Sequence, residues 1–309
     1  LTSIHIQGFK NFKDTKIEPL RKVNLILGGQ NVGKTSLLEA VWLGAGNLGN
    51  VYKLPSIFRL GDDGDVRRFF ESVFDGNYLF SIVLKNELNE DYKTSVFNVN
   101  YWMDSYIRSV VFNSALMQPK SVPFNALPIS INPVQQMDMV LFMEDIVIKR
   151  KKRALLNLLE KIESRLLDVN SLSLDSERRV YVELDGLEKA IPLPQLGHGF
   201  SRLFNLYCSL LVADSKLALI DEIENGIHYS SLPTMFKGIQ QIAADNDIQS
   251  LITTHSWECI CAAYNVFSEA GRLEDFQLIR LEQDGENVQA VIIKDKNLET
   301  VMEAGYEIR

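Results

Sequence analysis

Residues 28–35 read Gly28-Gly29-Gln30-Asn31-Val32-Gly33-Lys34-Thr35 and match the pattern G-x-x-x-x-G-K-[ST] without a mismatch. The apolar run 23–27 before them is typical of a strand buried on both faces, and the apolar spacing in residues 37–43 after them is typical of a helix. A strand, a glycine-rich turn and a helix in this order form a loop that binds phosphate groups. The stretch therefore predicts an α/β protein with a phosphate site at the end of a central strand.

The residue types in this loop fit a nucleotide carried with Mg²⁺. Glycines let the backbone approach phosphate oxygens, and the turn directs N–H groups and a helix N-terminus toward the anion. Lys34 would bring its charge to the β- and γ-phosphates, and Thr35 would offer its hydroxyl to Mg²⁺. The candidate cofactor-binding residues are Gly28, Gln30, Asn31, Val32, Gly33, Lys34, Thr35 and Ser36. A chance match in an ordinary turn is the alternative, which the flanking strand and helix disfavour. The sequence has no N-K-x-D-like segment that would favour GTP over ATP.

Two adjacent carboxylates follow a second buried strand. Residues 217–220 are apolar and lead into Asp221 and Glu222, and ligands of open α/β sheets gather at the carboxyl ends of the strands. Asp221, together with Thr35, is the candidate Mg²⁺ ligand. Glu222 is a candidate catalytic residue that would orient or deprotonate the attacking water. Alone, the pair would equally fit a strand that ends in two solvated acids, but the phosphate loop upstream favours the catalytic interpretation.

A third candidate group follows the apolar strand 250–253. His255 lies two residues beyond that strand, one strand–helix–strand step after the acidic pair. Its imidazole could donate a hydrogen bond to the γ-phosphate, which makes His255 the second candidate catalytic residue beside Glu222. A lone histidine at a strand end is usually an ordinary surface or core residue. The catalytic interpretation of His255 therefore depends on its position one strand–helix–strand step after the acidic pair.

The remaining patterns predict how the chain is organised. Alternating apolar residues in 4–17 and 78–112 predict short strands, the latter a meander, and prolines between residues 119 and 133 predict loops. Helical spacing in residues 135–167 predicts one long helix or a helical hairpin that projects from the core. From residue 180 onward strands alternate with helices, which predicts a parallel sheet with helices on its faces.

The composition is that of an ordinary globular chain. The 309 residues are 46% hydrophobic and 23% charged, with a formal net charge of −8. These values exclude a disordered chain or a small disulfide scaffold, and they disfavour a protein whose whole surface coats nucleic acid. Three cysteines without zinc spacing and no apolar run long enough for a membrane helix predict a cytoplasmic protein without a membrane partner. The basic run 149–153 is a candidate contact for DNA or RNA, and a solvated helical turn is the alternative.

Three segments together resemble the ABC-type ATPase heads of the RecF, SMC (structural maintenance of chromosomes) and OLD (overcoming lysogenization defect) group. They are residues 6–12 ahead of the phosphate loop, residues 220–228 and residues 253–256. The resemblance covers nearly the whole chain. It implies an α/β P-loop NTPase fold in which residues 1–309 form a single ABC ATPase head. The head would carry an N-terminal antiparallel β-meander lobe and a helical insertion at 135–170.

In that group ATP lies between two heads, and one of them supplies a signature loop that precedes a helix. The matching stretch is 196–202, in which Gly197 stands where the common form has a serine, as the OLD-like branch tolerates. Residues 224–228 match the loop that crosses to the partner head, and His255 matches the switch histidine. The candidate contacts to the partner's ATP are Gly197, His198 and Gly199, with Ser201 and Arg202 as further donors. The resemblance therefore implies a homodimer or a higher homo-oligomer joined through its ATP sites.

Standalone members of this group commonly serve in bacterial anti-phage defence, where a separate protein supplies a nuclease or toxin. Too few residues follow His255 for a further nuclease domain. The leading hypothesis is therefore an ATPase that regulates a separate effector, with residues 135–167 as the place for effector or DNA contact. A RecF-like DNA-repair clamp that binds DNA in an ATP-dependent way is the alternative. A scaffold with a degenerate site and a membrane-transporter ATPase fit less well, because Lys34, Asp221 and Glu222 are intact and the signature loop is non-standard.

Overall fold

The structure, a computed structural model, describes residues 1–45, 78–85, 91–104, 107–114, 126–129, 136–174 and 177–304. Among these residues the central element is a six-stranded sheet in the order β14-β13-β3-β12-β11-β7, with β14 antiparallel to β13 and the other neighbours parallel. Its strands are β3 (Val23–Gly28), β7 (Ala126–Ile129), β11 (Leu217–Ile220), β12 (Gln249–Thr253), β13 (Phe276–Asp284) and β14 (Asn287–Ile293). The predicted α/β fold with a parallel sheet is confirmed.

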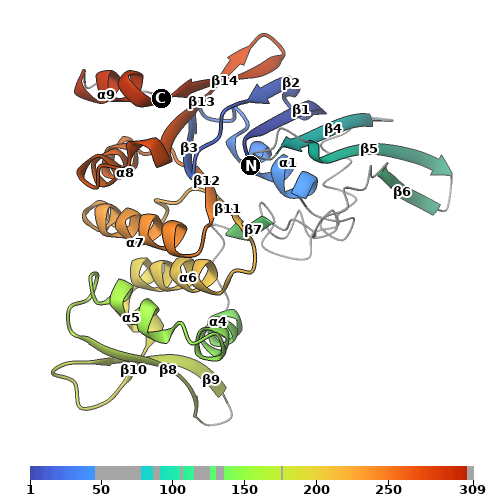
Figure 1. Cartoon of the computed structure of the whole chain (residues 1–309). Helices are drawn as coiled ribbons and strands as arrows, with labels where there is room; N and C mark the ends of the chain where they lie inside the picture. Colours follow the sequence, from blue (N-terminus) through green and yellow to red (C-terminus); the bar gives the residue numbers. More distant parts are fainter. Residues whose placement is uncertain are drawn as a thin grey trace.

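Helices cover both faces of this sheet (Figure 1). One face packs on three helices, and the other packs on α1. Alternate residues of β3 belong to the two sides, since Leu25 lies in the core with the three helices and Ile26 lies in the core with α1. A strand buried on both faces reads as a continuous apolar run, which is why its sequence does not alternate. The helices are α1 (Lys34–Ala45), α6 (His198–Val212), α7 (Leu232–Asp245) and α8 (Trp257–Glu269), and α9 (Asp295–Glu303) follows β14.

A five-stranded antiparallel sheet lies over α1 (Figure 1). The order of its strands is β2-β1-β4-β5-β6. Strand β4 lies close to α1 at Gly44, where a Cβ would lie only 2.6 Å from Ile82 Cγ2. The strands are β1 (Ser3–Phe9), β2 (Phe12–Ile17), β4 (Tyr78–Lys85), β5 (Asp91–Asp104) and β6 (Ile107–Ser114). The predicted N-terminal β-meander lobe is therefore present.

The prediction of helix through residues 135–170 is wrong beyond Leu159. The structure has α4 (Gln136–Ile148) and α5 (Lys152–Leu159), and the chain then enters a three-stranded sheet, β10-β9-β8. The strands of this sheet are β8 (Leu166–Leu174), β9 (Glu177–Leu184) and β10 (Ile191–Pro192). Leu166 continues the helical spacing by chance but is a buried strand residue. The two helices lie between this sheet and α6 and share its hydrophobic core, so they do not project as an arm (Figure 1).

Two local features also differ from the expected pattern. Pro128 lies in β7 rather than in a loop, and it is tolerated because β7 is an edge strand of the described sheet, opposite Leu219 of β11. The basic run is not one helical turn: residues 149–151 connect α4 to α5, with Arg150 at a φ of 56°, and Lys152 and Arg153 begin α5. No helix within the described ranges is long and apolar enough to cross a membrane.

The lysines of the basic run have structural partners. Lys149 Nζ donates to the carbonyl of Val212 at the end of α6, and Lys151 Nζ donates to Asn246 Oδ1 at the end of α7, 3.2 Å away. Lysines at helix C-termini stabilise the orphan carbonyls and the negative end of the helix dipole. The third lysine of the run, Lys152, forms an ion pair with Asp168 of β8. These contacts favour the structural interpretation of the run over a nucleic-acid contact.

Candidate nucleotide and hydrolysis site

The loop of residues 28–35 leads from the carboxyl end of β3 into α1 and has backbone angles that require glycine. Gly28 has a φ of 144°, and a Cβ there would lie 2.6 Å from the carbonyl oxygen of Leu281 on the neighbouring strand β13. Gly33 has a φ of 114° and lies against the ring of Phe12. Asn31 takes the left-handed conformation with a φ of 60°, which asparagine tolerates better than most residues. The loop is therefore tightly fixed between two strands and the N-terminal lobe.

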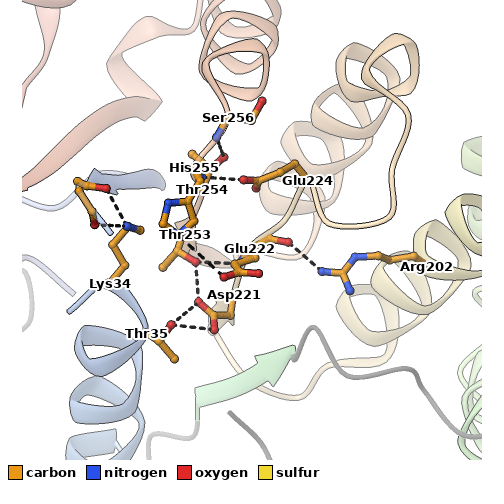
Figure 2. Close-up of polar contacts among 12 residues, drawn as sticks. Lys34, Thr35, Arg202, Asp221, Glu222, Glu224, Thr253, Thr254, His255 and Ser256 are labelled. Atoms are coloured by element: carbon orange, nitrogen blue, oxygen red, sulfur yellow. Dashed lines mark hydrogen bonds and ion pairs between the residues drawn. The ribbon is translucent and has the colours of Figure 1, made fainter. Parts of the chain in front are cut away.

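Lys34 is the buried cation of this loop. Its side chain curls back, and Nζ donates to the carbonyls of Gly28 and Gly29 at 2.7 and 2.8 Å (Figure 2). Burial lowers the pKa of the ammonium from its usual value, while the nearby carboxylates, Glu222 foremost, act in the opposite direction. The ammonium thus lies at the loop, close to the acidic strand end, where a phosphate would exchange for the carbonyl contacts.

Asp221 is joined to the phosphate loop through hydroxyl groups. Thr35 Oγ1 lies 3.1 and 3.2 Å from its two carboxylate oxygens, and Thr253 Oγ1 donates to Oδ1 at 2.6 Å (Figure 2). Burial raises the pKa of Asp221 above its usual value, and the bonds from Thr253 and Thr35 oppose that shift. Only 2% of Asp221 is exposed. A buried carboxylate beside a hydroxyl is the pair of oxygen donors that Mg²⁺ takes from a protein when phosphates supply other ligands.

Glu222 has an unusual backbone conformation for a glutamate. Its φ is 43°, a left-handed value that costs free energy for a residue with a Cβ and that persists only where the surroundings enforce it. Its N–H donates to Thr253 Oγ1 at 2.8 Å, and its carbonyl accepts from the N–H of Asn225 at 3.0 Å and from Arg202 Nη2 at 2.9 Å. Thr253 therefore positions both acids of the pair, by donating to Asp221 and accepting from Glu222.

His255 faces the carboxylate of Glu222. Its Nε2 lies 3.9 Å from Glu222 Oε1, and both side chains are partly exposed, 45% and 36%. The backbone N–H of His255 donates to Glu224 Oε1 at 2.6 Å, while Glu224 Oε2 is buried and has no hydrogen-bond partner among the described residues. The partly exposed side chains of Glu222 and His255 can reach a bound molecule, and Glu224 fixes the strand end that carries the histidine.

Arg202, at the end of the signature-like stretch 196–202, lies on the other side of Glu222 from Lys34 (Figure 2). Gly197 precedes α6 with a φ of 92° and, as the N-cap residue, has no side chain that could cap the helix. A Cβ at Gly199 would lie 3.1 Å from the carbonyl oxygen of Gly226, so the signature-like turn packs on the 224–228 loop of the same chain. His198 is exposed beside it.

The structure thus brings five predicted residues together at one edge of the sheet, and three more residues contact them there. The five are Lys34, Thr35, Asp221, Glu222 and His255. The three are Thr253, Arg202 and Glu224. Arg202 and Glu224 were predicted to act toward the partner head, and the sequence indicated none of these contacts within one chain. The sequence held one signal for Thr253. This threonine ends β12, the parallel neighbour of β11, and parallel strands end at the same edge of the sheet, so its hydroxyl could be expected near Asp221.

Comparison with known proteins is consistent with this geometry. A family described as "AAA domain, putative AbiEii toxin, Type IV TA system" matches residues 84–258, which is more than half of the chain and includes the acidic pair and His255. This chain belongs to that AAA-domain family. A curated relative of this AAA-domain protein, described as an ATP/GTP phosphatase of Helicobacter pylori, is 23% identical over 98% of each chain.

Solved structures share the fold of the AAA-domain protein. An SMC head bound to the C-winged helix domain of ScpA superposes with a TM-score of 0.57 at 12% identity, over 97% of this chain and 99% of the other. The SMC head domain from Thermotoga maritima gives 0.53 at 14% identity, over 96% and 99%. The predicted SMC-head-like P-loop fold is therefore confirmed, and the chain is a P-loop ATPase of the AAA kind.

Proposed function

We propose that this chain is a cytoplasmic ATPase in which two copies hold ATP and Mg²⁺ in shared sites, and that hydrolysis there regulates a separate effector. The observation that supports the proposal is the hydrogen-bonded group Thr35–Asp221–Thr253–Glu222, in which Asp221, the proposed metal ligand, and Glu222, the proposed catalytic base, lie beside the phosphate loop. Residues 1–309 would act as one ATPase domain.

In this proposal the loop binds the nucleotide. The backbone N–H groups of the loop and of the start of α1 donate hydrogen bonds to the phosphate oxygens, and Lys34 moves from the carbonyls of Gly28 and Gly29 to the β- and γ-phosphates. Thr35 and Asp221 would hold Mg²⁺, which neutralises charge on the phosphates when it is bound. A cation there would also balance the buried charge of Asp221.

Glu222 and His255 would carry out the hydrolytic step. The exposed part of the Glu222 carboxylate accepts a proton from a water molecule as that water attacks the γ-phosphorus, and the bond to the β-γ bridging oxygen breaks to release ADP and phosphate. His255, 3.9 Å from the carboxylate, would donate a hydrogen bond to a γ-phosphate oxygen. Thr253 keeps Glu222 in register with Asp221 through the two bonds of its hydroxyl.

The second copy would complete the site through the start of α6. The first N–H groups of a helix have no partner within it, and the N-cap residue here, Gly197, has no side chain to bond them. Gly197, His198 and Gly199 would present these groups to the γ-phosphate bound by the other copy. Because the same turn packs on Gly226, the 224–228 loop would lie in the same interface.

The effector would dock on the region of α4, α5 and β8. Apolar side chains there are exposed, namely Leu141, Val147, Ile148 and Leu167. A groove of about 590 Å³ runs between α5 and the start of β8, lined by Lys152, Arg153, Leu156, Asn157, Glu160, Leu167 and Asp168. Bacterial anti-phage defence is the process we propose, on the sequence resemblance to standalone ATPases of such systems, with a nuclease or toxin as the effector.

Steady-state turnover and nucleotide binding test this assignment. We expect Glu222→Gln to bind ATP with Mg²⁺ as tightly as the wild type but to hydrolyse it at least about 100-fold more slowly. Lys34→Ala, which removes charge-assisted bonds worth about 1.5–3 kcal/mol each, should lose binding itself. Wild-type turnover in Glu222→Gln would refute the catalytic role given to that residue.

A further inference from the structure

Arg202 makes an unexpected contact within its own chain. It lies in the second turn of α6, and its Nη2 donates to the carbonyl oxygen of Glu222 at 2.9 Å (Figure 2). Its side chain passes the 224–228 loop, since a Cβ at Gly226 would lie 3.9 Å from Arg202 Cδ. The guanidinium is therefore directed at the acidic strand end rather than at the N-terminus of α6.

The atom that Arg202 contacts belongs to a strained residue. Glu222 has a positive φ, and its conformation is held by the Thr253 hydroxyl on the N–H side and by Asn225 and Arg202 on the carbonyl side. Thr253 belongs to strand β12 of the sheet, and Asn225 belongs to the turn that follows Glu222. The Arg202 bond connects this backbone to α6, so a change at α6 can reach Glu222 through it.

The guanidinium of Arg202 lies in an acidic environment. Burial lowers the pKa of Arg202, and Glu224, Glu222 and Asp221 favour the charged form in that order. Two oxygens could accept hydrogen bonds from the guanidinium. One is the carbonyl oxygen of Glu222, which does so, and the other is the buried Oε2 of Glu224. Because Glu224 Oε1 accepts from the N–H of His255, the same cluster also touches the strand end that carries the histidine.

We propose that Arg202 is a positioning residue that ties the orientation of Glu222 to the N-terminal turn of α6. When that turn docks on a nucleotide held by a second copy, Arg202 would orient Glu222 of the first copy so that its carboxylate can take a proton from the attacking water. The inference rests on the proposed shared sites. It assigns to Arg202 an effect on turnover and none on nucleotide contact.

The test compares Arg202→Met and Arg202→Lys with a matched control, Arg21→Lys. Arg21 also donates to backbone carbonyls, those of Leu273 and Phe276 at 2.8 and 2.9 Å, in another part of the structure. Each variant is measured for kcat and KM, for binding of a fluorescent ATP analogue and for mass with ATP and Mg²⁺.

We expect Arg202→Met to lower kcat by about 10- to 100-fold, the range that corresponds to one hydrogen bond from a charged donor. Nucleotide Kd and the ATP-dependent mass should stay within about twofold of the wild type. Arg202→Lys should recover part of kcat, because a lysine can still donate to the carbonyl, and Arg21→Lys should leave kcat unchanged. In the Glu222→Gln background, Arg202→Met should cause no further loss, because the arginine acts only through Glu222.

Wild-type kcat in Arg202→Met would overturn the inference. A Kd or a dimer mass that falls in step with kcat would also overturn it and would assign Arg202 to direct contact with the partner's ATP. If Arg202→Met does not fold, the kcat-against-KM split of Arg202→Lys decides the same question. A wild type that stays monomeric with ATP would refute the shared sites themselves, whatever the variants do.

Discussion

Thr253 is the residue whose replacement tests the geometry of the site most sharply. Its side chain is fully buried, donates to Asp221 at 2.6 Å and accepts from the N–H of Glu222 at 2.8 Å. Thr253→Val keeps the shape and removes both bonds. Thr253→Ser is the matched control, because it keeps the hydroxyl and removes one methyl group.

The magnitude follows from the two lost bonds. The bond to the carboxylate is worth about 1.5–3 kcal/mol, and a buried N–H left without a partner costs about 1–3 kcal/mol. Thr35 remains bonded to Asp221, and the carboxyl can protonate, so we expect a loss near the lower end, about 3 kcal/mol of unfolding free energy at neutral pH. Thr253→Ser should lose about 1 kcal/mol, the value of one buried methyl group.

The loss should depend on pH with a defined sign. Burial already raises the pKa of Asp221 above its unfolded value, and the Thr253 bond lowers it, so the variant's pKa is higher still. A carboxyl with a raised pKa stabilises the fold at low pH and loses that contribution as the pH rises through the folded pKa. The difference between Thr253→Val and the wild type should therefore shrink in acid to the pH-independent cost of the unpaired Glu222 N–H, and it should be largest above the pKa of Asp221.

Urea unfolding followed by circular dichroism, without nucleotide or Mg²⁺, measures these differences at pH 5 and pH 8. A Thr253→Val protein within about 0.5 kcal/mol of the wild type at pH 8 would refute the assigned bonds. So would a Thr253→Ser protein that is destabilised as much as Thr253→Val.

Two further predictions concern the phosphate loop and the metal ligand. Gly28→Ala should destabilise the fold by about 3 kcal/mol or more, because the new Cβ would lie 2.6 Å from the Leu281 carbonyl oxygen at a φ of 144°, whereas Gly29→Ala, with nothing within 4 Å of its Cβ, should stay within about 0.5 kcal/mol in the same urea experiment. Asp221→Asn should raise the melting temperature in Mg²⁺-free buffer, and more at pH 8 than at pH 5, because the wild type carries a buried charge that burial disfavours; a lower melting temperature than the wild type at pH 8 would contradict the cost assigned to that charge.

The parts of the fold that depend on local sequence could be predicted from it. The strand, turn and helix around residues 28–35 and the strand that ends in Asp221 are coded by contiguous residues, so they follow from pattern alone. The segment after α5 could not be predicted, because Leu166 fits the helical spacing and only pairing with β9 makes it a strand. Tertiary pairing overrides local spacing in such short segments.

The candidate site divides in the same way. Residue type and strand position indicated Glu222 and His255, which lie 3.9 Å apart. The contacts of Thr253 and Arg202 depend on side chains 20 to 32 residues from their partners, and no spacing rule encodes these. The left-handed backbone of Glu222 is likewise a product of its neighbours, since the sequence places no glycine or asparagine there.

The most direct test of the shared-site mechanism is the mass in solution of the wild type and of Glu222→Gln, each with and without ATP and Mg²⁺. We predict a dimer or larger assembly that forms only with ATP and that accumulates in Glu222→Gln, in which the bound nucleotide persists. A protein that stays monomeric in all four conditions would contradict the claim that two copies share the nucleotide.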